Sequence, residues 1–252
     1  MEIIAFMNQK GGVGKTTSAV NIGAGLARLG RRVLLIDIDP QAHATISLGL
    51  PEEMEKTIYE LLTDAAPAAD VIIERDGLAV IPSGLQLAAA EMQLVGLPAR
   101  EMIMKAAIAD IVVNYDYVLI DCPPSIGALT MNALAAASAV YVPVKTEYLP
   151  IQGIGQLTKS VELVRHRLNP RLKIKGVFGT FYDGRRTINR DVMDYIRQTF
   201  GAAVFNTAIR ANIALAEAPK AGKTIFEHAP TSHGAADYMA LCDEIVSREA
   251  VK

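Results

Sequence analysis

Residues 10–17 read Lys10-Gly11-Gly12-Val13-Gly14-Lys15-Thr16-Thr17, and this stretch decides how the rest of the 252-residue chain is interpreted. It follows an apolar segment, residues 2–7, with the pattern of a strand, and it opens an amphipathic helix with apolar residues at helical spacing. A glycine-rich loop between a strand and a helix directs successive backbone N–H groups at phosphate oxygens, and the helix N-terminus adds partial positive charge. The sequence therefore predicts a phosphate-binding loop.

The side chains of this loop suggest distinct roles. Lys15 would bring a full charge to the β- and γ-phosphates, and the Thr16 hydroxyl could bind Mg²⁺. The pattern G-x-x-x-x-G-K-[ST] would place glycine at position 9, where this chain has Gln9, and a second lysine, Lys10, precedes Gly11. Two lysines crowd one loop unless each faces a different triphosphate, so we expect Lys10 to point away from the phosphates that Lys15 holds.

Short apolar segments alternate with amphipathic ones along the whole chain, which predicts an α/β fold: a doubly wound, mostly parallel sheet with helices on both faces, of the P-loop NTPase type. We expect one domain, residues 1–252. Gly30 and Gly201 should end helices, the pair Thr57 and Glu60 has capping-box spacing, and Pro98 suits a first helical turn. The expected strands are Glu2–Met7, Arg32–Asp37, Leu78–Pro82, Tyr117–Asp121, Ala139–Val144, Ile174–Thr180 and Ala203–Phe205.

Three aspartates lie at the ends of predicted strands, Asp37 and Asp39 after one and Asp121 at the end of another. In a doubly wound sheet, the carboxyl ends of the strands line the ligand crevice. An apolar strand ending in Asp beside a phosphate loop is the Walker B arrangement, in which the carboxylate orients Mg²⁺ or its waters. Any one of them could instead cap a helix.

The charge of the chain is unevenly distributed. The formal net charge is −2, but residues 41–116 hold 4 Lys/Arg against 12 Asp/Glu, whereas residues 159–223 hold 13 against 5. Within the basic half, Arg186, Arg190 and Arg197 fall on one side of a predicted helix, with Val192 and Ile196 opposite. The stripe could contact a polyanion, or it could be an ordinary solvated helix face.

Several classes are disfavoured. Hydrophobic residues make up 51% of the chain, which excludes a disordered protein. The distant Cys122 and Cys242 form neither a disulfide framework nor a zinc site, which suits a reducing cytoplasm, and the N-terminus lacks the features of a signal peptide. The uncharged stretch from Cys122 to Val144 is long enough to span a bilayer but is better explained as a helix followed by a buried strand.

The loop and several later blocks resemble the ParA/MinD ATPases, which carry a deviant Walker A motif, and the ParA and Soj partition ATPases in particular. The resemblance covers nearly the whole chain. The blocks that carry it are NQKGGVGKTTSAVNIGAGLARLGRRVLLIDIDPQ, YVLIDCPPSIGALTMNALAAA, VPVKTEYLPIQGIGQL, TFYDGR and LAEAPKAGKTIFEHAPTSHGA.

The resemblance implies a slow ATPase that uses Mg²⁺ and works as a homodimer. Lys10 would reach the phosphates of the partner subunit in an ATP-sandwich dimer, and Asp39 would position the attacking water. Thr16, Asp37 and Asp121 would surround Mg²⁺. Pro123-Pro124-Ser125 would sense the γ-phosphate, and the residues that bind ATP would be Lys10, Gly11, Gly12, Val13, Gly14, Lys15, Thr16 and Thr17.

The resemblance also implies that the dimer binds nonspecific DNA through the basic half, with Arg185 matching a DNA-contacting arginine of the family, and that a ParB-like partner stimulates hydrolysis. From the stripe, we expect Arg186 and Arg190 to join Arg185 in contacting DNA. Such a protein would be cytoplasmic and nucleoid-associated, partitioning a chromosome, a plasmid or another cargo. Ala211 and Ala214 stand where relatives have arginines, and Arg210 stands where relatives have a proline near the adenine.

Three alternatives remain. A MinD-like membrane-associated ATPase would need a basic C-terminal helix, but this tail is mostly acidic, and an iron–sulfur carrier would need more cysteines. The third is a P-loop ATPase of unrelated metabolic role, which differs from the partition ATPases in that ATP, without another substrate, would not drive dimerisation and DNA retention.

Overall fold

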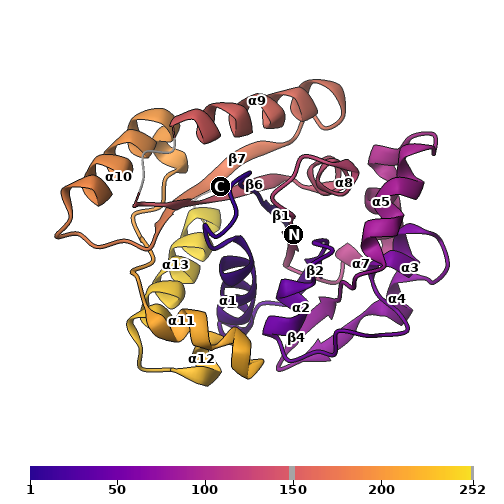
Figure 1. The fold of residues 1–252 in the computed structure, drawn as a ribbon, viewed down its shortest axis with the longest axis horizontal. Helices are drawn as coiled ribbons and strands as arrows, with labels where there is room; N and C mark the ends of the chain where they lie inside the picture. Colours follow the sequence, from indigo (N-terminus) through magenta and orange to yellow (C-terminus); the bar gives the residue numbers. More distant parts are fainter. Residues whose placement is uncertain (148–150, 251–252) are drawn as a thin grey trace.

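A seven-stranded sheet forms the centre of a computed structural model that describes residues 1–147 and 151–250 (Figure 1). Its strand order is β3-β4-β2-β5-β1-β6-β7, and only β3 and β4 pair antiparallel. The strands are β1 (Glu2–Phe6), β2 (Val33–Asp37), β3 (Ile73–Arg75), β4 (Leu78–Ile81), β5 (Tyr117–Asp121), β6 (Ala139–Lys145) and β7 (Lys173–Thr180). The predicted doubly wound, mostly parallel sheet is confirmed.

Helices cover both faces of this sheet. The α-helices are α1 (Lys15–Arg28), α2 (His43–Ser47), α3 (Ile58–Leu62), α4 (Ala68–Val71), α5 (Leu87–Val95), α6 (Ile103–Ala107), α7 (Ala109–Val112), α8 (Ala128–Ala136), α9 (Ile151–Arg167), α10 (Thr187–Phe200), α11 (Ile213–Glu217), α12 (Ile225–His228) and α13 (His233–Ala250). Short 3₁₀ turns are η1 (Arg100–Met102), η2 (Gly201–Ala203) and η3 (Pro219–Ala221). Helices α1, α12 and α13 contribute to one buried apolar cluster, and α3, α5, α6, α8, α9 and α10 contribute to another.

Successive side chains along a strand point to opposite faces of the sheet, so they belong to different apolar clusters. In β1, Ile4 and Phe6 join the cluster with α1 and α13, whereas Ala5 joins the other cluster. In β2, Leu34 and Leu35 divide in the same way. Because helices cover both faces, every residue of β2 and β5 is buried, which explains the continuous apolar runs in the sequence.

Most of the predicted helix boundaries are observed. Gly30, with φ of 76°, follows α1, and Gly201, with φ of 53°, follows α10. Thr57 caps α3 in a capping box, because its backbone N–H donates to Glu60 Oε2 at 2.7 Å and its hydroxyl accepts from the N–H of Tyr59 at 3.1 Å. The expectation for Pro98 was wrong, since this residue lies in the turn between α5 and η1.

Two strand predictions need correction. Ala203–Phe205 is not a strand: residues 201–203 form the 3₁₀ turn η2, so only Val204 is left to make an isolated bridge with Val177. Strand β3 was not predicted, because its sequence Ile-Glu-Arg is short and charged. It pairs with β4 at the edge of the sheet, where one open side tolerates charge.

The uncharged stretch from Cys122 to Val144 is, as expected, a loop, the helix α8 and most of the buried strand β6. Within the described part of the chain, no helix is both long enough and apolar enough to cross a bilayer. The thiols of Cys122 and Cys242 are free and buried in the core.

Candidate functional site

The loop of residues 10–17 connects the carboxyl end of β1 to the N-terminus of α1, as predicted. Gly12 and Gly14 have φ values of 67° and 90°, in the left-handed region that glycine adopts without strain. One side chain from β7 and one from the residues just before the loop hold its backbone. The Thr180 hydroxyl donates to the carbonyl of Val13 at 2.9 Å, and the Asn8 side chain accepts from the N–H of Lys10 at 3.0 Å.

Lys15 is buried at the start of α1, and its Nζ donates to the carbonyl of Lys10 at 3.2 Å. Burial lowers the pKa of Lys15, while the negative charges of Asp121 and Asp39 oppose that shift. The ammonium therefore lies within the field of the carboxylates that the sequence placed at the ends of β2 and β5.

Asp37 and Asp121 are adjacent, because they are paired in the register of the parallel strands β2 and β5. Both side chains are fully buried. Asp37 accepts hydrogen bonds from the N–H and the hydroxyl of Thr45, at 2.9 and 2.8 Å, and from the N–H of Asp39 at 3.1 Å. Burial raises the pKa of Asp37 to about 6, although these hydrogen bonds favour its charged form.

The carboxylate of Asp121 has no hydrogen-bond partner at either oxygen among the residues described. Burial is the main cause that raises the pKa of Asp121 well above its usual range, and the charge of Asp37 raises this pKa further. The Thr16 side chain and the positive charge of Lys15 partly oppose the rise. An unpartnered buried carboxylate is costly unless another group satisfies it. Oxygen-rich sites of this kind suit Mg²⁺, so Thr16, Asp37 and Asp121 fit the metal that the sequence predicted.

An open cleft of about 440 Å³ lies along the loop, and Lys15 and Thr16 line it. Asp39 lines it, and the N–H of Gln41 donates to Asp39 Oδ1 at 3.0 Å, which holds the carboxylate at the rim. Residues from the loop, from the segment after β2 and from two distant prolines form its wall: Gly11, Gly12, Gly14, Lys15, Thr16, Thr17, Asp39, Gln41, His43, Ser47, Pro124 and Pro219.

Lys10 does not line this cleft. It lines a neighbouring groove, which meets the cleft at Gly11, together with Asn8, Lys145 and residues of α9, and its Cε lies near Gly153. Lys10 and Lys15 therefore point into different spaces, although they belong to one loop.

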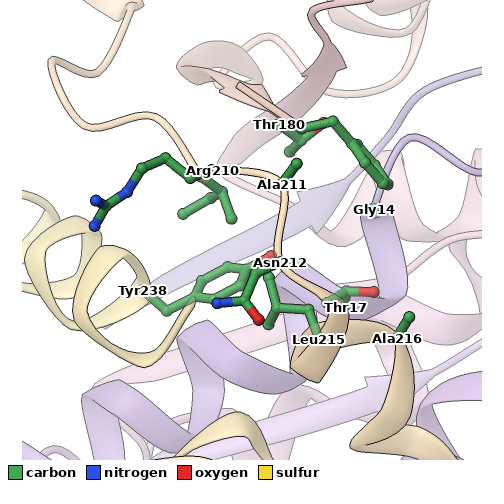
Figure 2. A pocket seen from close by; sticks show the side chains of 11 residues that line it. Gly14, Thr17, Thr180, Arg210, Ala211, Asn212, Leu215, Ala216 and Tyr238 are labelled. Atoms are coloured by element: carbon green, nitrogen blue, oxygen red, sulfur yellow. The ribbon is translucent and has the colours of Figure 1, made fainter. Parts of the chain in front are cut away.

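A second pocket of about 130 Å³ adjoins the loop on the side of α11 and α13 (Figure 2). Gly14 and Thr17 line both this pocket and the cleft, so the two spaces are continuous along the loop. The other residues that line it are mostly apolar: Thr180, Phe181, Ile209, Arg210, Ala211, Asn212, Leu215, Ala216 and Tyr238. The guanidinium of Arg210, which stands where relatives were expected to have a proline near the adenine, points away from the pocket.

The predicted arginine stripe is only partly on one helix. Arg186 is the N-cap of α10 with extended backbone angles, so helical spacing relates only Arg190 and Arg197. The helix begins late because the Asn189 side chain accepts from the N–H of Asp183 at 2.6 Å and holds the preceding turn. Val192 and Ile196 are buried, as predicted.

The arginines that were predicted to contact DNA form ion pairs or hydrogen bonds within the chain, and they remain exposed to solvent. Arg185, with 91% of its side chain exposed, pairs with Asp183 at 3.0 Å, and Arg186 lies 3.6 Å from the same carboxylate. Arg190 donates to the carbonyl of Gly184 at 2.8 Å. The three guanidinium groups therefore cluster around the turn that precedes α10.

Sequence reasoning missed several residues that build the site. Ser83 donates to the carbonyl of Asp39 at 2.7 Å, and its N–H donates to the Thr45 hydroxyl at 2.9 Å. Ser83 and Thr180 could have been found, because each lies at or just past the carboxyl end of a predicted strand. Thr45 lies in a helix of five residues and carries no such signal.

This chain is similar in sequence to several known proteins. Residues 1–174 match a family model described as an AAA domain. The chain is 45% identical to the sporulation initiation inhibitor protein Soj of Bacillus subtilis, over 98% of both chains. It is 46% identical to the chromosome-partitioning ATPase Soj of Thermus thermophilus, over 97% of this chain and 95% of the other.

A solved structure described as cobyrinic acid a,c-diamide synthase from Mycobacterium smegmatis, with a bound ATP analogue and magnesium, is also similar. It shares 35% identity and a TM-score of 0.86, covering 98% of this chain and 94% of the other. The matched lengths are nearly complete in all three comparisons. The chain belongs to the Soj/ParA family of chromosome-partitioning ATPases.

Proposed function

We propose that this protein is an ATP-dependent dimerising switch that binds nonspecific DNA and positions a chromosome, a plasmid or another cargo on the nucleoid. The observation that carries the proposal is the pair Asp37 and Asp121, buried side by side next to Lys15 and Thr16, with the Asp121 carboxylate unpartnered. The whole chain, residues 1–252, would act as one ATPase domain.

The phosphates of ATP would lie in the cleft, against the backbone N–H groups of residues 11–17 and the ammonium of Lys15. The base would enter the second pocket, because Gly14 and Thr17 line both spaces. Asn212 Oδ1 accepts from the N–H of Ala214 at 2.9 Å, which leaves the Asn212 amide N–H₂ as a donor for a ring nitrogen. No carboxylate lines this pocket among the described residues, which favours adenine over guanine.

Thr16, Asp37 and Asp121 would hold Mg²⁺, which supplies charge neutralisation at the phosphates. Thr45 fixes one Asp37 oxygen through two hydrogen bonds, so the orientation of that carboxylate is set before any ligand binds. Asp39, at the rim of the cleft, would orient the attacking water.

Lys10 would act on the partner subunit of a sandwich dimer, since its side chain leaves the cleft that Lys15 occupies. Hydrolysis would then be slow in the monomer, and a ParB-like partner would stimulate it in the dimer. A relative that is named chromosome partitioning protein ParA supports a chromosome as one class of cargo.

The guanidinium groups of Arg185, Arg186 and Arg190, clustered at one turn, would contact DNA phosphates without reading bases. A membrane-associated role is not favoured by the C-terminal helix. The apolar side chains of α13, including Leu241 and Ile245, are buried in the core and are not available to a lipid surface.

The test is phosphate release from ATP with Mg²⁺, measured per chain over a range of protein concentrations. A dimer-dependent site predicts that the rate per chain rises with concentration and then levels off. A rate per chain that does not change with concentration would contradict the dimer, and the absence of ATP-dependent phosphate release at every concentration would contradict the ATPase itself.

A further inference from the structure

Arg210, whose guanidinium points away from the second pocket (Figure 2), forms an ion pair with Asp237. Arg210 Nη2 donates to Asp237 Oδ1 at 2.6 Å, and Arg210 Nε lies 3.1 and 3.0 Å from the two carboxylate oxygens. The backbone N–H of Arg210 also donates to Asp237 Oδ2 at 2.9 Å. One carboxylate therefore binds both the side chain and the main chain of the same residue, and only 10% of that carboxylate-bearing side chain is exposed.

The pair joins two opposite walls of the pocket. Arg210 lies in the segment 209–212, which contributes Ile209, Ala211 and Asn212 to one wall. Asp237 lies on α13 next to Tyr238, which lines the pocket from the other side. The hydroxyl groups of Tyr238 and Ser18 are 3.0 Å apart, so α13 is in turn fixed to α1.

The segment 209–212 runs beside the end of β7 and the residues just after it, and the N–H of Tyr182 donates to the carbonyl of Ile209 at 3.0 Å. The N–H of Ile209 donates to the carbonyl of Gly179 at 2.8 Å, and the N–H of Ala211 lies 3.4 Å from the carbonyl of Tyr182. The ion pair with Asp237 attaches the same segment to the helix layer. The position of Ala211 and Asn212 over the pocket thus depends on an attachment to α13 as well as to β7.

We infer that Arg210 and Asp237 are positioning residues for the nucleobase. They hold the wall made by Ala211 and Asn212 at the distance from Tyr238 that the base requires, and neither charged group needs to touch the base. The inference rests on the proposed binding of ATP at this site. A bidentate guanidinium–carboxylate pair has a fixed planar geometry, so it can set this spacing in a way that a single flexible contact cannot.

The experiment compares three ligands on the full-length protein by titration calorimetry with Mg²⁺ present: ATP, ADP and inorganic tripolyphosphate. Tripolyphosphate has the phosphates of ATP without a base. The variants are Asp237→Asn, Arg210→Ala and Arg210→Lys. The lysine variant keeps the positive charge but lacks the planar guanidinium that can bind both carboxylate oxygens. Asp194→Asn is the matched control, because Asp194 forms an exposed pair with Arg197 on α10, away from the pocket.

Asp237→Asn and Arg210→Ala should each weaken ATP and ADP binding by about tenfold while leaving tripolyphosphate binding unchanged. Arg210→Lys should lie between wild type and Arg210→Ala, and Asp194→Asn should match wild type. A merely structural role would weaken all three ligands together, and that result would overturn the inference, as would wild-type ATP affinity in both Asp237→Asn and Arg210→Ala. Circular dichroism melting of each variant identifies any that does not fold, and Arg210→Lys then supplies the decisive comparison.

Failure of the proposed function gives a different result. If wild-type protein bound neither ATP nor tripolyphosphate, the nucleotide site itself would be refuted together with this inference. If wild-type protein bound both ligands and the variants bound ATP normally, only the role of Arg210 and Asp237 would be refuted.

Discussion

Gly49 and Gly222 contact each other through their backbones, although they lie far apart in the sequence. A Cβ atom on Gly49 would lie 2.9 Å from the carbonyl oxygen of Gly222, and a Cβ atom on Gly222 would lie 2.7 Å from the Cα of Gly49. Both residues have positive φ values, 73° and 62°. This contact joins the segment after α2 to the segment after η3, and Ser47 of α2 and Pro219 of η3 line the same cleft.

Replacing either glycine should therefore destabilise the protein by more than the cost of its backbone conformation alone. We expect Gly49→Ala to lower the free energy of unfolding by about 2 kcal/mol or more, from a left-handed backbone plus a steric clash. Gly30→Ala is the matched control, because Gly30 has a φ of 76° but no described atom within 4 Å of an added Cβ, so about 1 kcal/mol is expected. Urea denaturation measures both, and equal losses would contradict the close contact.

Lys15→Ala should abolish most ATP binding. The ammonium is the charged group of the loop that lies among the buried carboxylates, and no other cationic side chain lines the cleft apart from His43 when protonated, within the part of the chain described. Titration calorimetry with ATP and Mg²⁺ tests this expectation. Unchanged affinity would remove Lys15 from the site.

Lys10→Ala should separate binding from dimerisation. Because Lys10 lies in the groove beside α9 and not in the cleft, the variant should still bind ATP as a monomer. It should not form the sandwich dimer and should not hydrolyse ATP. Size-exclusion chromatography with light scattering measures the dimer, and normal ATP-dependent dimerisation of this variant would refute the role of Lys10 in the partner's site.

Asp39→Ala should spare ATP binding and depress turnover, since the carboxylate is expected to position water and not to hold the nucleotide. The variant should accumulate as an ATP-bound dimer. Asp39→Asn is a useful companion, because an amide oxygen can still accept from the N–H of Gln41 while the charge is removed. Wild-type hydrolysis rates in both variants would exclude Asp39 from the mechanism.

DNA binding should depend on ATP and fall steeply with salt. Each neutralised phosphate contributes about −0.9 to the slope of log K against log salt, and a dimer doubles the number of contacts. Replacing both Arg185 and Arg186 with alanine should reduce retention on nonspecific duplex DNA and flatten the slope. Arg32→Ala should not, because Arg32 forms an exposed pair with Asp116 outside the basic half.

Weaker retention than in relatives is also expected, since the resemblance to Soj-like chains implies arginines at the positions of Ala211 and Ala214. If the wild-type protein showed no ATP-dependent retention even at low salt, binding to the nucleoid would be ruled out.

The sequence alone determined the elements whose signal is local. The phosphate loop needs only glycines and Lys15 between a strand and a helix, and the positions of β2 and β5 follow from apolar runs ending in Asp37 and Asp121. Gly30, Gly201 and Thr57 marked helix ends correctly because capping uses groups within a few residues of each other. Even the pairing of Asp37 with Asp121 could be anticipated, since carboxyl ends of parallel strands meet at one edge.

Only the tertiary structure decided which distant groups meet. Thr45 bonding to Asp37, Gly49 touching Gly222 and Arg210 turning toward Asp237 depend on how loops from different layers pack, and no periodicity in the sequence encodes that packing. The Ala203–Phe205 prediction failed for a related reason: its apolar residues satisfied a strand pattern, but the 3₁₀ turn of η2 left a single residue beside β7. A local sequence pattern indicates which face of a segment is buried. The residues against which that face packs depend on the geometry of the whole fold.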